Sequence, residues 1–188
     1  MSRRRAVFLD RDGTLIEDVG YLRSPEQLLW VPGAGPALRA FQRAGYAIVV
    51  LTNQSGVARG YYSEDSVRLV NERIRDQALE RWGVEIDRFY FCPHHPDGSI
   101  GPYAIDCTCR KPAVGMFEDA IADLYIDPGR SIAVGDNVRD LVPARQVGVS
   151  RLFLSHITGA AHNASHQRYA HAPDWDDILE ALRTKDLI

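Results

Sequence analysis

Short apolar runs rich in branched residues alternate along the chain with longer stretches in which apolar and polar positions are mixed. The short runs predict five strands, at residues 6–10, 46–52, 88–92, 131–135 and 150–155. The longer stretches carry cap and glycine signals and predict five helices, at residues 34–44, 63–82, 114–124, 137–146 and 175–183. This alternation predicts an α/β fold, in which right-handed strand–helix–strand units build a mostly parallel sheet with helices on both faces.

The length of the chain limits how this pattern can be divided. With 188 residues, we expect a single domain over residues 1–188. Two stretches, 93–112 and 156–173, interrupt the alternation of strands and helices. Because neither exceeds a loop in length, no large cap domain is expected.

The composition narrows the class of protein. The chain is 45% apolar and 25% charged, as in ordinary soluble globular proteins. A net charge of −3 argues against a nucleic-acid binder held by bulk electrostatics. The apolar run after Arg3–Arg5 is too short for a signal peptide or a spanning helix, so we expect a cytoplasmic protein without membrane contact. No hydrophobic surplus suggests obligate assembly, and a monomer is expected.

Polar side chains gather where the predicted strands end or where a helix is about to begin. They are Asp10, Asp12, Thr52, Asn53, Gln54, Ser55, Lys111, Asp136, Asn137 and Asp140. Open α/β sheets bind ligands beyond the carboxyl ends of their strands, so these residues are expected to share one site. Individually, each has an ordinary alternative as a turn residue, a helix cap or a solvated charge. Together they suit phosphoryl transfer, with Asp140 holding Lys111 or a metal-bound water.

The chemistry follows from the anionic character of a phosphate monoester, which must be screened before an anion can attack it. Mg²⁺ prefers hard oxygen ligands, which Asp10, Asp136 and the backbone carbonyl of Asp12 can supply. Asp10 is then expected to attack phosphorus and form an aspartyl-phosphate, while Asp12 protonates the leaving alkoxide and later activates water. Thr52 and Lys111 are expected to stabilise the equatorial oxygens of the phosphoryl group.

All three cysteines fall between residues 92 and 109. Together with His94, they form the closed tetrahedral Cys₃His set of a structural zinc site: Cys92, His94, Cys107 and Cys109. His95 competes with His94 as a ligand, and we expect it to be the spare. One alternative is three unliganded thiols beside surface histidines. Another is a disulfide between the last two cysteines, which would close a small strained ring.

A zinc-stabilised loop over residues 92–109 would hold Lys111 within reach of phosphate. Arg110 could then reach a second anionic or hydroxyl group of the substrate.

A further group of histidines follows the last predicted strand: His156, His162, His166 and His171. Its surroundings lack carboxylates and thiols, so a solvated loop is expected there rather than a metal site.

The polar set resembles the haloacid dehalogenase superfamily. The phosphatases of that superfamily carry a DxDGT motif, here Asp10–Thr14, and a Thr after the second strand, here Thr52. They also carry a lysine, here Lys111, and a GDN-x-x-D element, here Gly135–Asp140. The resemblance implies Mg²⁺, a Rossmann-like sheet, Asp10 as nucleophile and an acid/base aspartate two residues later.

The cysteine loop narrows this resemblance. Cys92–Pro96, Cys107–Pro112 and Thr52–Gly60 together resemble the family of phosphatases that remove the 7-phosphate of D-glycero-D-manno-heptose 1,7-bisphosphate in bacterial heptose precursor synthesis. That resemblance makes Cys92, His94, Cys107 and Cys109 the zinc ligands. It also implies these substrate contacts: Asp18, Val19, Gly20, Tyr21, Thr52, Asn53, Gln54, Ser55, Arg110, Lys111 and Asn137.

Two other functions stay open at this point. The histidinol-phosphate phosphatases share the catalytic set and the zinc loop. A bisphosphate requires a cation for its distal group, which Arg110, Arg59 or Arg23 could supply, whereas histidinol phosphate favours acidic or aromatic neighbours. The twelve residues between His94 and Cys107 favour the heptose enzymes. A non-catalytic phosphosugar-binding module on the same fold is the alternative from a different class.

Overall fold

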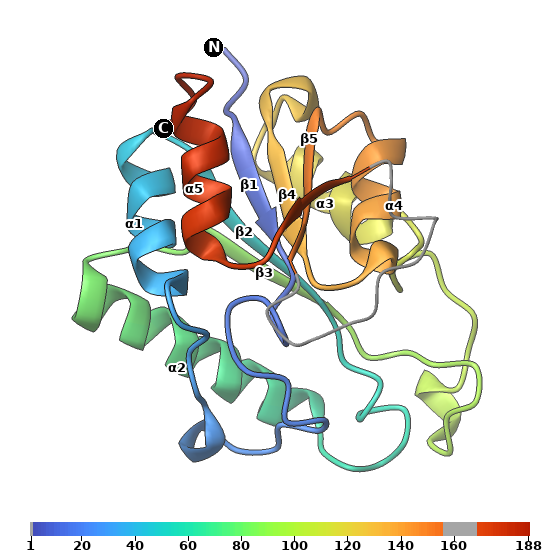
Figure 1. Ribbon diagram of the computed structural model, residues 1–188. Helices are drawn as coiled ribbons and strands as arrows, with labels where there is room; N and C mark the ends of the chain where they lie inside the picture. The colour runs from blue at the N-terminus through green and yellow to red at the C-terminus, as the bar shows by residue number, and fades with distance from the viewer. Residues whose placement is uncertain (1, 156–168) are drawn as a thin grey trace.

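The computed structural model describes residues 2–155 and 169–188, and a six-stranded sheet lies at its centre (Figure 1). In spatial order, the strands are β3 (Arg88–Cys92), β2 (Ala47–Asn53), β1 (Ala6–Leu9), β4 (Ile132–Gly135), β5 (Arg151–Ser155) and β6 (Ala170–Ala172). Each neighbouring pair in this sheet runs parallel. The chain builds outward from β1 to β3 and restarts at β4 on the other side of β1. This places a topological switch point between β1 and β4, where open α/β sheets bind ligands.

Helices cover both faces of the sheet. One face is covered by α1 (Ala34–Arg43), α2 (Glu64–Trp82) and α5 (Trp175–Arg183). The other face is covered by α3 (Gly115–Asp123) and α4 (Val138–Gln146). Along β1, Val7 and Leu9 pack with the first group of helices and Phe8 packs with the second, as expected of a strand buried on both faces. The predicted Rossmann-like three-layer α/β sandwich is therefore confirmed.

The bounds of the predicted helices and strands agree with the structure to within one residue at either end. Helix α2 shows why. Ser63 precedes it in an extended conformation, and its side chain accepts a hydrogen bond from the backbone N–H of Ser66 at 3.2 Å. Gly83 follows the last turn with φ of 65°, the left-handed conformation that glycine adopts readily. Local capping chemistry thus fixes both ends of this helix.

The stretch 156–173, expected to be a loop, includes a short strand that the sequence pattern did not predict. Strand β6 extends the sheet beside β5, and His171 lies exposed within it rather than in a loop. Three residues are too few to produce an apolar run, so this strand exists because β5 offers a partner. The expectations for His156, His162 and His166 lie outside the described residues. The single domain over 1–188 stays a prediction.

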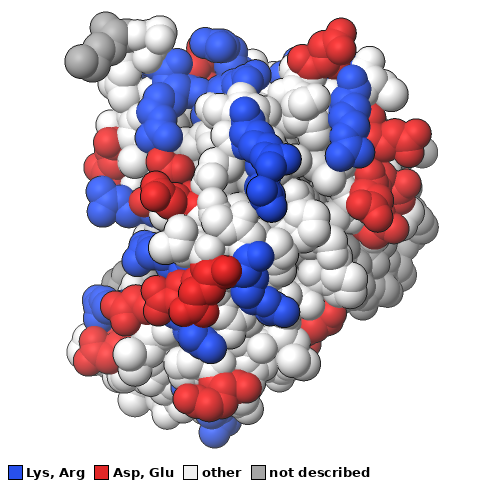
Figure 2. All heavy atoms as spheres, turned by 90° about the vertical axis from the view of Figure 1, so that its left-hand side faces the viewer, with Lys and Arg blue, Asp and Glu red and all other residues white. Residues whose placement is uncertain are grey.

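The remaining described connections include three single-turn 3₁₀ helices: η1 (Pro25–Gln27), η2 (Gly101–Tyr103) and η3 (Pro128–Arg130). Within residues 2–155 and 169–188, no helix has both the length and the apolar character required to cross a bilayer. Figure 2 shows the side of the molecule that carries α1 and α2, where acidic and basic side chains are interspersed. This mixture accords with the small net charge of −3.

Candidate active site

Three aspartates form an acidic cluster at the switch point of the sheet. Asp10 follows β1, Asp136 follows β4, and Asp140 lies in the first turn of α4. Their carboxylate oxygens lie within 4.8 Å of one another. The backbone N–H of Asp10 donates to the carbonyl of Val134 at 3.1 Å, which continues the pairing of β1 with β4. The parallel register of the two strands therefore brings residues more than a hundred positions apart into one cluster.

Lys111 supplies the cation of the acidic cluster. Its Nζ lies 2.5 Å from Asp10 Oδ1 and 2.8 Å from Asp140 Oδ1, and it donates to the carbonyl of Leu51 at 2.7 Å. Burial alone would lower the pKa of Lys111, but the two carboxylates outweigh burial and raise it. The ammonium is therefore charged, and Asp140 holds it as expected.

Three carboxyl groups share one ammonium, so full ionisation would leave the acidic cluster with more negative than positive charge. Burial raises the pKa of Asp10 well above its ordinary value; Lys111 opposes this shift, and Asp140 adds to it. Burial and the nearby Asp140 raise the pKa of Asp136 to about 7. A second cation would relieve this repulsion, and carboxylate oxygens are the ligands that Mg²⁺ prefers. The donor set therefore fits a hard divalent cation.

The glycine of the DxDGT motif is required by the closeness of its loop to Asp136. Gly13 has φ of 82°, and a Cβ placed on it would lie 2.5 Å from Asp136 Oδ2. Its N–H donates to the carbonyl of Ile16 at 2.7 Å, which closes the turn. Any other residue at this position would adopt a strained backbone and displace Asp136 from the acidic cluster.

Asp12 lies outside the acidic cluster and has partners of its own. Arg11 donates from Nε and Nη2 to its two carboxylate oxygens, at 3.1 and 3.2 Å. Gln54 Nε2 and Thr52 Oγ1 donate to Asp12 Oδ2, at 2.8 and 3.3 Å. The sequence did not single out Arg11, which is only 1% exposed. A charged residue between two predicted site aspartates was the only signal that could have indicated it.

Asn53, predicted to contact substrate, uses its side chain to support Lys111. Its Nδ2 donates to the carbonyl of Lys111, and its Oδ1 accepts from the N–H of Lys111, each at 3.0 Å. This pair of bonds joins the end of β2 to the segment that delivers the lysine. Asn53 still lines the cavity described below, but its amide group is already bonded on both sides.

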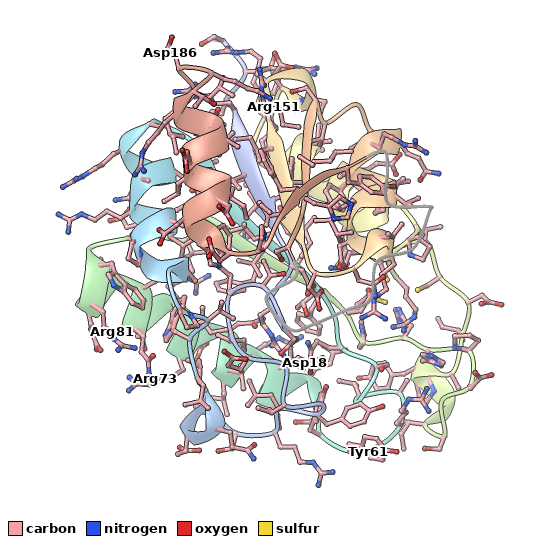
Figure 3. All side chains as sticks on the ribbon, viewed as in Figure 1. Asp18, Tyr61, Arg73, Arg81, Arg151 and Asp186 are labelled. Atoms are coloured by element: carbon pink, nitrogen blue, oxygen red, sulfur yellow. The ribbon has the colours of Figure 1, made fainter. Side chains whose placement is uncertain are left out.

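A cavity of about 290 Å³ opens beside the acidic cluster. It is lined by Asp10, Asp12, Asp18, Gly20, Tyr21, Thr52, Asn53, Gln54, Ser55, Tyr62, Arg110, Arg139 and Asp140. Figure 3 places Asp18 below the carboxyl ends of the strands and Tyr61 further out, at the lower edge of the view. The rings of Tyr21 and Tyr61 meet edge to face, with centroids 4.6 Å apart. Polar groups therefore make up most of the lining of the cavity, which Tyr21 and Tyr62 also border.

Most of the predicted substrate contacts reach this cavity, but three do not line it: Val19, Asn137 and Lys111, whose ammonium is buried against Asp10 and Asp140. Val19 is 49% exposed, and Asn137 caps α4 by accepting a hydrogen bond from the N–H of Arg139 at 3.1 Å. Conversely, Tyr62 and Arg139 line the cavity although the sequence did not single them out. Both follow motif residues by only a few positions, and nothing in their local pattern distinguishes them from surface residues.

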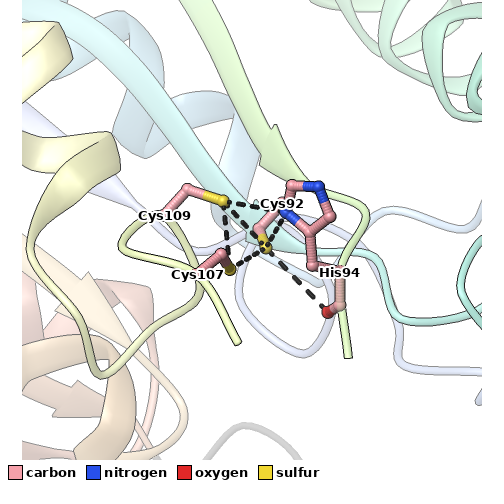
Figure 4. A group of neighbouring side chains, drawn as sticks. All are labelled: Cys92, His94, Cys107 and Cys109. Atoms are coloured by element: carbon pink, nitrogen blue, oxygen red, sulfur yellow. Dashed lines mark hydrogen bonds between the residues drawn. The ribbon is translucent and has the colours of Figure 1, made fainter. Parts of the chain in front are cut away.

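The second group of potential metal ligands is the Cys/His cluster, formed by Cys92, His94, Cys107 and Cys109 (Figure 4). The three sulfur–sulfur distances are 3.1, 3.4 and 3.5 Å. His94 Nδ1 lies 3.3 Å from the sulfur of Cys109 and 3.7 Å from that of Cys92. The three cysteines are free thiols, so the alternative disulfide is not formed.

These separations suit four ligands around one ion. Sulfurs bound at about 2.3 Å in a tetrahedron lie roughly 3.8 Å apart, close to the spacing observed here. Burial raises the pKa of the Cys92 thiol, so a bound cation would be required to keep its thiolate. His95 lies outside the Cys/His cluster, as expected, because its ring contacts Arg59 Nη2 at 3.3 Å and accepts from the N–H of Asp97 at 3.1 Å.

Comparison with known proteins agrees with this geometry. Residues 108–184 match a family model described as HAD-hydrolase-like. The D-glycero-beta-D-manno-heptose-1,7-bisphosphate 7-phosphatase of Haemophilus ducreyi is 45% identical over 179 residues, which cover 95% of this chain and 94% of that protein. The enzyme of the same name from Yersinia pestis is 39% identical, over 94% of this chain and 90% of its own length.

A solved structure extends the likeness to three dimensions. It is that of D,D-heptose 1,7-bisphosphate phosphatase from B. bronchiseptica in complex with magnesium and phosphate. It superposes with a TM-score of 0.78 at 28% identity and covers 96% of this chain and 99% of its own. The sequence identity to these enzymes extends over nearly the whole chain, and the catalytic motifs and the Cys/His cluster agree with it. The chain belongs to the family of D-glycero-beta-D-manno-heptose-1,7-bisphosphate 7-phosphatases.

Proposed function

We propose that this chain hydrolyses the 7-phosphate of D-glycero-β-D-manno-heptose 1,7-bisphosphate with the help of Mg²⁺. The observation that carries the proposal is the acidic cluster with its buried lysine, open to a polar cavity in a chain of this family. The relatives are named for the β anomer, and we assign the same anomer to this chain.

Asp10, Asp136 and the backbone carbonyl of Asp12 would hold the Mg²⁺. When bound, this ion supplies positive charge that screens the phosphate from the attacking carboxylate. Asp140 lies close enough to the other two aspartates to contribute, but its Oδ1 already contacts Lys111 and its Oδ2 accepts from the N–H of Asn137 at 3.1 Å. We therefore assign Asp140 to the lysine and to the helix cap.

Asp10 acts as the nucleophile. An oxygen of its carboxylate forms a bond to phosphorus as the bond from phosphorus to the sugar oxygen breaks, which leaves an aspartyl-phosphate. Asp12 gives its proton to the departing sugar oxygen and then takes a proton from the water that hydrolyses the intermediate. Lys111 touches Asp10 at 2.5 Å, so its charge favours the ionised nucleophile and balances the equatorial oxygens as they gain charge. Thr52, which lines the cavity, is assigned to the same equatorial oxygens.

The distal phosphate requires a cation at the far end of the cavity. Arg110 and Arg139 both line the cavity, and neither forms an ion pair with a carboxylate within the described part of the chain. Burial and the like charge of Arg139 lower the pKa of Arg110. Two guanidinium groups that repel each other suit a dianion between them. Arg59 and Arg23 contact His95 and Tyr61 instead, so we assign the distal phosphate to Arg110 and Arg139.

Zn²⁺ in the Cys/His cluster is the second part of the proposal, with a structural role. The cluster joins the end of β3 to the segment that carries Arg110 and Lys111. Arg110 Nη1 also donates to the carbonyl of His94 at 3.3 Å, which ties the two parts of the loop together. An ion with four protein ligands leaves no open position for chemistry, so it would act by placing these two cations.

The test is a comparison of kcat/KM, with Mg²⁺ present, on the two anomers of heptose 1,7-bisphosphate and on histidinol phosphate. We expect the β bisphosphate to be preferred. A preference for histidinol phosphate would overturn the assigned substrate. Tight binding of the bisphosphate without release of phosphate would overturn the assigned activity and favour a non-catalytic binding module.

A further inference from the structure

Arg11 is a buried cation that the proposed mechanism does not use. Its side chain is 1% exposed and is not among those that line the cavity, so it does not reach substrate. Taking a guanidinium out of water costs free energy unless its donors are satisfied. The partners that satisfy Arg11 therefore indicate what it does.

Those partners are Asp12 on one side and Asn71 on the other. Nε and Nη2 donate to the two oxygens of Asp12, at 3.1 and 3.2 Å, and Nη1 donates to Asn71 Oδ1 at 2.9 Å. Asn71 is 4% exposed in the middle of α2, a position that an apolar residue would ordinarily fill. Because a guanidinium is planar and rigid, an anchor on one edge sets the orientation of the carboxylate bound to the other.

The hydrogen bonds to Asp12 are distributed unequally between its two oxygens. Oδ2 accepts from Arg11 Nε, from Gln54 Nε2 at 2.8 Å and from Thr52 Oγ1 at 3.3 Å. Oδ1 accepts only from Arg11 Nη2 among the described residues. Gln54 is held in this orientation by the hydroxyl of Tyr62, which donates to Gln54 Oε1 at 2.9 Å. Oδ1 is thus the oxygen with a lone pair left to carry a proton.

We propose that Arg11 and Asn71 form a positioning pair, which turns Asp12 so that Oδ1 faces the leaving oxygen. This inference rests on the proposed function, because it concerns the proton transfer of that reaction. As the bond between phosphorus and the sugar oxygen breaks, the proton on Oδ1 moves to that oxygen, while the carboxylate of Asp10 forms the new bond to phosphorus. Arg11 itself exchanges no proton and touches neither substrate nor phosphate.

The experiment compares two leaving groups. A sugar alkoxide requires a proton to depart, whereas p-nitrophenolate departs without one. The comparison uses kcat/KM, which covers the steps up to departure of the leaving group and excludes the later hydrolysis of the aspartyl-phosphate. We expect Arg11→Met and Arg11→Lys to lower kcat/KM on heptose 1,7-bisphosphate by roughly 100-fold, and kcat/KM on p-nitrophenyl phosphate by less than about 3-fold. Lysine keeps the charge but cannot span both oxygens and Asn71, so wild-type activity of Arg11→Lys would overturn the role assigned to the guanidinium.

Asn71 gives a second route if the Arg11 variants fold poorly. Asn71→Leu removes the acceptor for Arg11 Nη1, and we expect a loss of about 10-fold with the same dependence on leaving group. Asn71→Asp keeps an oxygen acceptor and should restore most of the activity. The matched control is Arg73→Met, which removes a guanidinium that projects from the outer side of the same helix (Figure 3).

The outcomes separate this inference from the proposed function. If the wild-type protein releases no phosphate from the bisphosphate, the proposed function fails. If the wild-type protein is active and the variants lose equal factors on both leaving groups, the positioning pair fails while the function stands.

Discussion

The acidic cluster and the Cys/His cluster both gather potential metal ligands, but different parts of the structure hold them in place. Asp10 and Asp136 follow two hydrogen-bonded strands at the centre of the sheet, so the fold itself brings them together. Cys107 and Cys109 lie in the long connection between β3 and α3, where the described structure has only a single-turn helix, η2. A metal ion would therefore add chemistry to the acidic cluster, whereas it would add structure to the Cys/His cluster.

The two clusters also differ in charge and access. The acidic cluster has its own cation in Lys111 and borders an open cavity, as a site that exchanges substrate requires. The Cys/His cluster has four ligands of its own and a buried Cys92, so it has no vacant side for a substrate. Changes in the acidic cluster should therefore act on turnover, and changes in the Cys/His cluster should act on stability first.

The largest expected effect is that of Asp10→Asn. An amide cannot attack phosphorus, so kcat on the heptose bisphosphate should fall by at least about 10⁴-fold, while the melting temperature stays close to that of the wild type or rises. Steady-state phosphate release and a thermal melt provide the two measurements. Phosphatase activity that survives this substitution would rule out the aspartyl-phosphate intermediate.

The second effect is a loss of stability when a ligand of the Cys/His cluster is replaced, and it should occur for His94 but not for its neighbour His95. Cys109→Ser and His94→Gln should lose bound zinc and about 3 kcal/mol of unfolding free energy, which corresponds to a melting temperature lower by roughly 6–12 °C. Elemental analysis and thermal melts measure these changes. His95→Gln is the matched control, because His95 lies outside the Cys/His cluster, and it should keep one zinc per chain. Freshly purified wild-type protein without zinc would contradict the assignment.

A smaller effect is expected for Asp140→Asn. The amide can still cap α4, but it no longer supplies a negative charge to Lys111, whose Nζ lies 2.8 Å away. We expect kcat/KM to fall by about 10- to 100-fold with little change in melting temperature, as for other groups that support a catalytic residue. A loss as large as that of Asp10→Asn would mean that Asp140 takes part in the reaction itself.

The last prediction concerns how the stability of the folded protein depends on pH, because of the carboxyl groups crowded in the acidic cluster. The pKa of Asp136 rises to about 7 in the folded protein because of burial and Asp140, whereas in the unfolded chain it is near 3.8. The folded state therefore retains a proton that the unfolded state loses. This stabilisation is fully present below about pH 4 and is lost as the pH rises through about 7.

In Mg²⁺-free buffer, the melting temperature of the wild-type protein should thus fall by more than that of Asp136→Asn as the pH rises from about 4 to 8. Added Mg²⁺ should raise the wild-type melting temperature more at the upper end of this range. The same pH profile in both proteins would show that Asp136 is ionised throughout.

Much of the fold and part of the site could be predicted because their signals are local. The apolar runs, Ser63 and Gly83 mark element ends within a few residues of themselves, and the structure agrees with them. Strand β6 escaped prediction because it depends on β5 as a partner. Asn53 was expected to contact substrate, but its role as a support for Lys111 depends on a residue 58 positions away.

The amino-acid sequence by itself determined the sandwich, the two aspartates of the motif and the spacing of the cysteine ligands, because periodicity, turn chemistry and ligand type are written along the chain. Only the tertiary structure decided which cations serve which carboxylates. Lys111 pairs with Asp10, and Arg11 joins Asp12 to Asn71. These pairings span up to 101 positions and follow from the register of parallel strands and the packing of α2, which no local pattern encodes.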